Sequence, residues 1–206
     1  MCIFRTLTVV RLKVAVANDR SLTLKQTPKD FLMALSMSQA SVPVFVIGLN
    51  ALSAVLDKAE AHAAAKKIDP AVLPTSRLAP DMFSLTRQVQ TACDLAKKGT
   101  ARLAGVEAPV FEDNETTIEQ LKARVAKTVA YLKSLDGKAI DASADREITF
   151  PLGPTNKGHM KGNDYLNHFV LPNFYFHLTA AYAILRHCGV DIGKRDYLGA
   201  IPMTMT

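Results

Sequence analysis

Apolar residues recur at alternating intervals of three and four positions in four segments of this chain, which is the pattern of a one-sided, amphipathic helix. We predict helices over residues 42–63, 79–105, 116–137 and 171–189. Their apolar stripes are, in chain order, Val42, Phe45, Leu49, Leu52, Leu56, Ala59 and Ala63; Met82, Leu85, Val89, Ala92 and Ala96; Ile118, Leu121, Val125, Val129, Leu132 and Leu135; and Phe174, His177, Ala181, Ile184 and Cys188. Four helices bury such stripes around one shared core, which predicts an all-α, up-and-down four-helix bundle.

Capping residues place the ends of these predicted helices. Pro80 and Asp81 suit the first turn of the second helix, because proline needs no N–H there and an acidic side chain complements the positive helix end. Thr116 and Glu119 have the spacing of a capping box for the third helix. Pro172 suits the start of the fourth helix and Gly189 its end.

The segments between and beyond the helices set the domain boundaries. Residues 146–170 alternate β-forming residues and then contain several glycines, which predicts a small hairpin or a long loop between the third and fourth helices. We expect one domain over residues 33–199, ending in an ordered strap, and a frayed tail over residues 200–206. Residues 1–32 are predicted to be a disordered extension or a segment upstream of the true start at Met33, with an organelle-targeting peptide as the alternative.

Charge and cysteine content narrow the partners and the compartment. Of the net charge of +6, residues 1–32 contribute +4, because they hold six basic and two acidic residues. The remainder has no basic stripe interleaved with aromatic residues, so we predict no binding to nucleic acid. Three cysteines without a CxxC pair favour the cytoplasm. Residues 31–56 carry no charge, yet serines, Gln39, Asn50 and the apolar stripe favour an amphipathic core helix, and no membrane partner is predicted.

His177 is the strongest candidate for chemistry, because it is the one histidine on an otherwise apolar helix stripe. A buried imidazole needs hydrogen-bonding partners. Asp81 and Gln88, seven residues apart on one face of the second helix, and Asn173, one turn before His177, are the candidates. An Asp81–His177 pair would form a general base. The simpler alternatives are a hydrogen-bonded core histidine, an Asp81 that only complements the helix dipole, and a Gln88 that faces solvent.

Apolar and aromatic residues near His177 predict a small-molecule pocket. Phe45 and Met82, with Phe174, would line it unless they are ordinary core residues. Tyr175 and Tyr182 lie seven residues apart and would line the same pocket or form a packing or dimer surface.

Several segments resemble a known family. The stretch MSQASVPVFVIGLNALSAVLDKAEAHA, the RLAPDMF and VFEDNETT helix entries, and LPNFYFH through GVDIGKRDYLG are similar to the uncharacterised domain-of-unknown-function family nineteen-ninety-three. That resemblance implies the DinB/YfiT-like superfamily of four-helix bundles, whose members include proposed metal-dependent enzymes and are often dimers. It covers most of the chain beyond residue 32.

The residues depart from the superfamily's metal pattern. Metal-binding relatives combine a histidine with an H-x-x-x-H pair on another helix, and this chain has no such pair: His168, His177 and His187 are nine and ten residues apart. We therefore predict no metal and no cofactor. The preferred hypothesis is a helical-bundle protein, dimeric, that binds a small molecule near His177. The alternatives are a metal- or His/Asp-dependent hydrolase or transferase of DinB type and a purely structural dimeric interaction protein.

Overall fold

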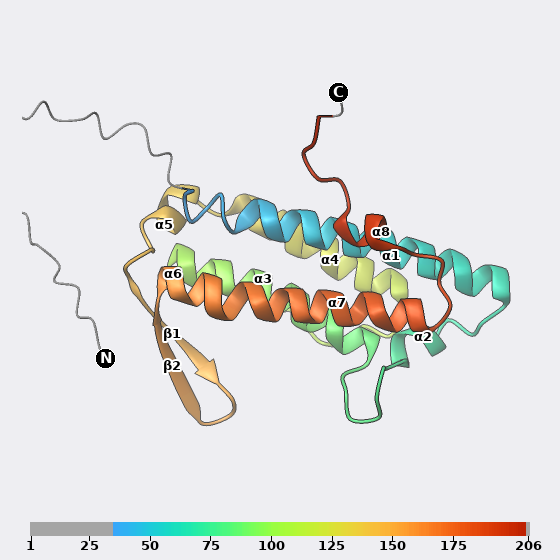
Figure 1. Cartoon of the computed structure of the whole chain (residues 1–206). Coiled ribbons are helices and arrows are strands. Elements are labelled where there is room, and N and C mark those ends of the chain that lie inside the picture. The colour runs from blue at the N-terminus through green and yellow to red at the C-terminus, as the bar shows by residue number, and fades with distance from the viewer. Residues whose placement is uncertain (1–34, 205–206) are drawn as a thin grey trace, which may run out of the picture. The chain divides into compact units, whose positions relative to one another are not determined.

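Four long helices form the bundle in the computed structural model, which describes residues 35–204. They are α1 (Val42–Lys66), α3 (Leu85–Ala104), α4 (Ile118–Ser134) and α7 (Leu171–His187). α1 packs against α4, α4 against α3, α3 against α7, and α7 against α1, so the helices close a ring around one core (Figure 1). The predicted all-α bundle is confirmed. The predictions for residues 1–32 and for the last two residues of the tail lie outside the described residues.

The order of helix directions differs from a simple up-and-down bundle, because α3 and α4 run the same way. The loop after α3 returns along that helix, so that Asp113 meets Arg87 and Glu115 meets Gln90 in the first turns of α3. α4 then begins beside the start of α3, and its Arg124 reaches Asp94 halfway along (Figure 1). The thirteen residues 105–117 can extend over about 40 Å, more than the roughly 30 Å length of α3. This crossover loop makes the parallel pair possible.

Residues 146–170 contain the predicted hairpin and a helical segment that was not predicted. β1 (Glu147–Leu152) and β2 (Asn156–Lys161) pair antiparallel, with Glu147 opposite Lys161. The hairpin projects from the bundle (Figure 1). After it, α6 (Gly162–Asp164) and a π-helical segment (Tyr165–Val170) run directly into α7. The chain is therefore already helical ten residues before Pro172. Proline fits here because it lies in the first turn of α7, just after the wider π-helical turn.

Two predicted helix starts are displaced. α3 begins at Leu85, after Ser84, rather than at Pro80. Residues 76–84 form a loop because Arg77 Nη1 donates to the carbonyls of Pro80 and Met82, and the Leu85 N–H donates to Ser76 O. The capping box of α4 is Thr117 with Gln120, one residue after the predicted pair, since the Gln120 side chain accepts from the backbone N–H of both Thr116 and Thr117.

Three short helices complete the described residues. α2 (Val72–Thr75) follows α1, and α5 (Gly137–Asp141) follows α4. α8 (Lys194–Leu198) lies in the predicted strap and packs on α1, where Asp196 accepts from Lys58 Nζ at 2.7 Å. The strap is thus partly helical, although it lacks a helical stripe long enough to have predicted this.

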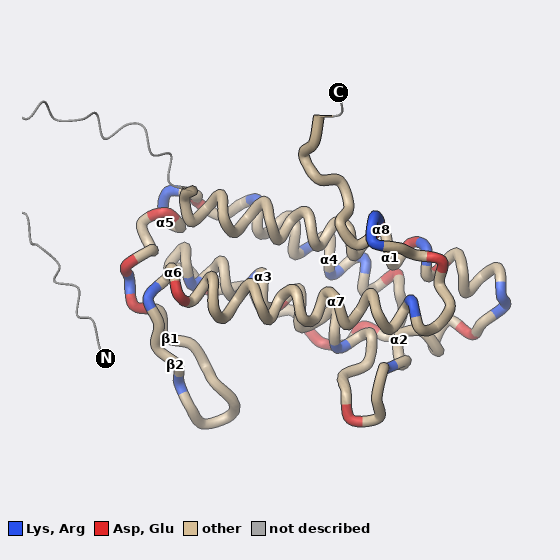
Figure 2. The backbone as a smooth tube through the Cα atoms, viewed as in Figure 1, with Lys and Arg blue, Asp and Glu red and all other residues tan. Residues whose placement is uncertain are grey.

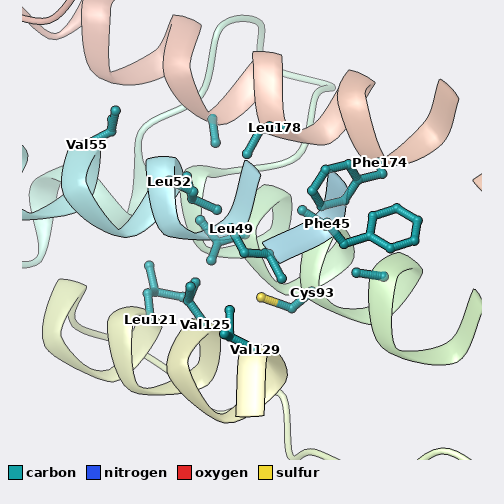
Figure 3. Close-up of a cluster of buried hydrophobic side chains, with 14 of the residues drawn as sticks. Phe45, Leu49, Leu52, Val55, Cys93, Leu121, Val125, Val129, Phe174 and Leu178 are labelled. Carbon is teal, nitrogen blue, oxygen red and sulfur yellow. The ribbon is translucent and has the colours of Figure 1, made fainter. Parts of the chain in front are cut away.

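Side chains from all four long helices meet in the core (Figure 3). The Phe45 ring packs edge to face against the Phe174 ring, with centroids 5.0 Å apart. Glycines let the helices approach closely: a Cβ on Gly48 would lie 3.0 Å from Phe174, and one on Gly99 would lie 2.6 Å from Val170. The labelled core residues are Phe45, Leu49, Leu52, Val55, Cys93, Leu121, Val125, Val129, Phe174 and Leu178. The predicted stripes therefore do face one another.

Charge is unevenly distributed over the helices (Figure 2). α7 carries one residue among Lys, Arg, Asp and Glu, namely Arg186 near its end. α1 is, among the described residues, the one helix long and apolar enough to cross a membrane by length and composition. Its apolar face is buried in the core, where Phe45 and Leu49 are fully covered, so packing inside the protein accounts for that composition.

Candidate functional site

His177 is paired with Gln88 across the α3–α7 contact. The His177 Nδ1 and Gln88 Oε1 atoms are 2.7 Å apart, and Gln88 Nε2 donates to the carbonyl of Phe83 at 3.2 Å. Because that carbonyl can only accept, the amide oxygen of Gln88 faces His177, and Nδ1–H is the donor. Nε2 of the neutral ring then carries the lone pair. The imidazole is held in one tautomer and presents a weak base at Nε2.

The surroundings of His177 favour its neutral form. The side chain is half-buried, and burial lowers the pKa of His177 below its ordinary value of 6.5, with a further contribution from the positive charge of Arg87. The ring stacks near Phe83, with centroids 6.2 Å apart. His177 is therefore neither fully in the core nor free in solvent.

This lowered pKa makes stability depend on pH in a definite direction. As the pH falls through about 6.5, the unfolded chain takes up the proton of His177 before the folded chain does, so the folded state loses stability. We expect wild type to lose more unfolding free energy than His177→Gln between about pH 7.5 and about pH 5.5. Urea unfolding of both proteins at the two pH values measures the difference, and equal losses would contradict the lowered pKa.

The other residues predicted around His177 are only partly brought together. Asp81 is exposed in the loop before α3, and the structure of residues 35–204 records no hydrogen bond or ion pair for it. The predicted Asp81–His177 pair is therefore not formed, and Asp81 lies outside the helix whose dipole it was expected to complement. Asn173 Nδ2 donates to the Phe169 carbonyl at 2.7 Å instead of joining His177. Gln88 is buried, so it does not face solvent.

The predicted pocket residues also separate. Phe45 and Phe174 are fully buried and in contact, which makes them core residues, and Met82 lies in the loop before α3. Tyr182 packs against Tyr197 of α8, with ring centroids 5.6 Å apart. Tyr175 is 43% exposed, and its neighbour Phe176 is 58% exposed. These two aromatic side chains on the nearly uncharged α7 suit a dimer interface, and the homodimer stays a prediction.

A groove of about 240 Å³ lies along one face of α3. One wall is a face of α3, and the other is formed by Pro151 of β1 and by the π-helical segment. The lining residues are Arg87, Gln90, Thr91, Asp94, Leu95, Lys98, Gly99, Arg102, Pro151, Tyr165 and Phe169. We call it the α3 groove. Arg87 lines its end and also acts electrostatically on His177, so the His177–Gln88 pair lies near that end, although neither residue of the pair lines the groove.

Ionic contacts hold two of the three cations in the α3 groove. Arg87 Nη1 is 2.6 Å from Asp113 Oδ2, and Lys98 Nζ is 2.6 Å from Asp94 Oδ2. Arg102 is half-buried and donates from Nη1 to the Tyr165 hydroxyl at 3.0 Å. Burial raises the pKa of Tyr165, and the nearby Arg102 opposes this shift. Tyr165 is thus a neutral hydroxyl that keeps its proton.

Sequence reasoning missed the α3 groove for a physical reason. Its α3 residues have the three–four spacing of a polar helix face, and such a face is ordinarily solvated. The opposite wall comes from the π-helical segment, more than sixty residues later in the chain, where a loop was expected. The one available signal was the pair of aromatic residues Tyr165 and Phe169, four apart, directly after the hairpin sequence.

The side chains of residues 35–204 that could bind a metal lie apart from one another. Within residues 35–204 no three side chains of His, Cys, Asp or Glu lie close enough together to hold a metal ion. Among those same residues, no carboxylate or second imidazole bonds to Nε2 of His177, and Cys93 is buried next to Thr128, where burial raises the pKa of its thiol to about 12. These described residues do not fit the three-histidine site of metal-binding relatives.

Comparison with known proteins places the chain in a family. The family described as "Domain of unknown function (DUF1993)" matches residues 37–198, so the chain belongs to that family, and the predicted resemblance is confirmed. Among solved structures, a DinB family member protein from Shewanella denitrificans is 43% identical in sequence. The similarity covers 82% of this chain and 96% of that one, with a TM-score of 0.76. A comparison with curated proteins finds no match.

Proposed function

We propose that this DinB-like bundle protein binds a small molecule in the α3 groove, near the His177–Gln88 pair. The observation that carries the proposal is the groove itself, which combines apolar residues of both walls, Leu95, Pro151 and Phe169, with a few fixed polar groups. Ligand sites in proteins have this composition. A volume of about 240 Å³ suits a ligand smaller than a typical drug.

The position of the groove also supports binding. The groove lies between one long helix and the π-helical segment, and π-helical turns occur frequently at functional sites. Within the groove, Arg102 is held by the hydroxyl of the buried Tyr165 at 3.0 Å. A ligand in the groove would therefore meet preorganised partners, which lowers the entropy cost of binding.

A substitution that fills the α3 groove tests this function. We expect ligand-observed NMR with a library of small fragments to give hits that compete with one another on wild type and on Leu95→Met, which keeps the side-chain volume. Leu95→Trp should lose those hits, because the indole occupies the half-buried space at the groove wall. Circular dichroism checks that both variants are folded. Hits that survive in Leu95→Trp, or no hits on wild type, would overturn the proposal.

A further inference from the structure

We infer that the ligand of the α3 groove is a small monocarboxylate with an apolar body, its carboxylate held by Arg102 and its body lying along Leu95, Pro151 and Phe169. This inference rests on the proposed function and names the chemical class of its ligand. It follows from the ionic partners of the lining residues and from the shape of the apolar wall.

Arg102 is the cation of the groove that lacks an acidic partner. Arg87 is paired with Asp113, and Lys98 is paired with Asp94, whereas no carboxylate of residues 35–204 lies within ion-pair distance of Arg102. A guanidinium presents five N–H donors in a planar fork, and the Tyr165 hydroxyl accepts from only one terminal nitrogen. The remaining donors match the planar geometry of a carboxylate.

Tyr165 makes Arg102 a preorganised binding group. The tyrosine is 1% exposed, and its ring packs on Phe150 and Phe169, with centroids 4.8 and 5.7 Å away. Its hydroxyl oxygen is therefore fixed, and it fixes the Nη1 end of Arg102. While that oxygen accepts from Arg102, its own proton is available for a second acceptor. An anion beside Arg102 would receive donors from both side chains.

The number of available cations in the groove suits a singly charged ligand. Asp94 also lines the α3 groove, and its carboxylate is already paired with Lys97, Lys98 and Arg124. Arg102 alone among the lining cations has no acidic partner within residues 35–204, so it balances a monocarboxylate but only half the charge of a dianion such as phosphate. The apolar body then has a wall to contact, because Phe169 lies against Phe150, with centroids 4.4 Å apart, and is held in place.

Two probes of nearly the same shape, one anionic and one neutral, test the inference. We expect phenylacetate to bind wild type, as followed by amide chemical shifts of the full chain. Its neutral analogue phenylacetamide should bind at least about tenfold more weakly. Arg102→Gln should weaken phenylacetate binding about tenfold, and Arg102→Lys should weaken it less, because charge remains while the fork is lost. Lys133→Gln is the matched control, since it removes the same charge from an exposed position on α4 outside the groove.

The outcomes separate this inference from the function on which it rests. Equal affinity for the two probes, or equal effects of Arg102→Gln and Lys133→Gln, would overturn the carboxylate assignment and leave binding in the groove intact. Failure of phenylacetate to bind wild type would overturn the carboxylate assignment as well, while fragments that bind wild type and not Leu95→Trp would still support the groove. If no fragment binds wild type in that screen, both the carboxylate assignment and the proposed binding in the α3 groove are overturned.

Discussion

Arg124→Ala is expected to lower the free energy of unfolding by about 3 kcal/mol, because it leaves the nearly buried Glu115 without an ionic partner among residues 35–204 and removes one partner each from Asp94 and Asp113. The Arg124 side chain is 2% exposed and lies between three acidic residues. Its Nη2 is 3.0 Å from Asp94 Oδ1 and 3.0 Å from Asp113 Oδ1, and its Nη1 is 2.9 Å from Glu115 Oε1. Urea unfolding followed by circular dichroism measures the loss.

The size of this effect follows from what Arg124 connects. Asp113 and Glu115 belong to the crossover loop, Asp94 belongs to α3, and Arg124 itself is on α4. Its Nη1 also donates to the Glu112 carbonyl at 3.1 Å. One side chain therefore fixes the returning loop to both of the parallel helices that the loop joins. Without it, Glu115, which is only 10% exposed, keeps the Gln90 amide but loses its cation.

A second ion pair of the same carboxylate provides the control. Lys98 also pairs with Asp94, at 2.6 Å, but its side chain is 49% exposed. Lys98→Ala should therefore cost under about 1 kcal/mol. Arg124→Lys should fall between the two, because it keeps the charge and loses the fork. If Arg124→Ala and Lys98→Ala were equally stable, the buried position of Arg124 would be refuted. If Arg124→Ala does not fold, Arg124→Lys should still be less stable than Lys98→Ala, and the opposite order would contradict the argument.

Local periodicity was sufficient to predict the four long helices and their buried faces. Phe45, Leu49, Leu121, Val125 and Phe174 are all in the core, because a helix stripe must be covered wherever the helices lie. The relative direction of two helices cannot be predicted from local periodicity. The parallel α3–α4 pair depends on the crossover loop, and its ion pairs between residues 87 and 113 or 94 and 124 connect positions that no periodicity relates. The length of the loop was the only hint in the sequence.

The candidate site could be predicted only in part for a similar reason. The apolar stripe of the fourth helix correctly predicted that His177 faces the second helix. Gln88, one of its predicted candidate partners, is the residue that bonds to it. The predicted pairing of Asp81 with His177 was wrong, because Pro80 and Asp81 resemble the start of a helix but lie in a loop. Hydrogen bonds from Arg77 hold that loop outside α3. The α3 groove depends on a π-helical turn within residues 146–170, where the pattern of the sequence indicated a hairpin or a long loop.

Gly162→Ala is expected to destabilise the protein by about 3 kcal/mol, at the upper end of the usual cost of overpacking. A Cβ at Gly162 would lie 2.0 Å from the Ser143 carbonyl oxygen. This neighbour is backbone, and Ser143 is itself buried, with its hydroxyl bonded to the Ile140 carbonyl at 2.6 Å, so it cannot move away cheaply. The sequence suggested loop punctuation at Gly162, whereas the structure requires glycine for a close approach of two segments.

The control for this substitution is Gly193→Ala, because nothing lies within 4 Å of a Cβ at Gly193 and its φ of −134° suits any residue. We expect this control to cost under about 1 kcal/mol in urea unfolding. Gly162 also fixes the start of the π-helical segment, since its N–H donates to Arg146 O and the Asn163 N–H donates to Ala144 O. Amide chemical shifts of Tyr165 and Phe169 should therefore move in Gly162→Ala and stay unchanged in Gly193→Ala. Equal stability of the two variants would mean that Gly162 and Ser143 are not in contact, and unmoved shifts would separate this junction from the wall of the α3 groove.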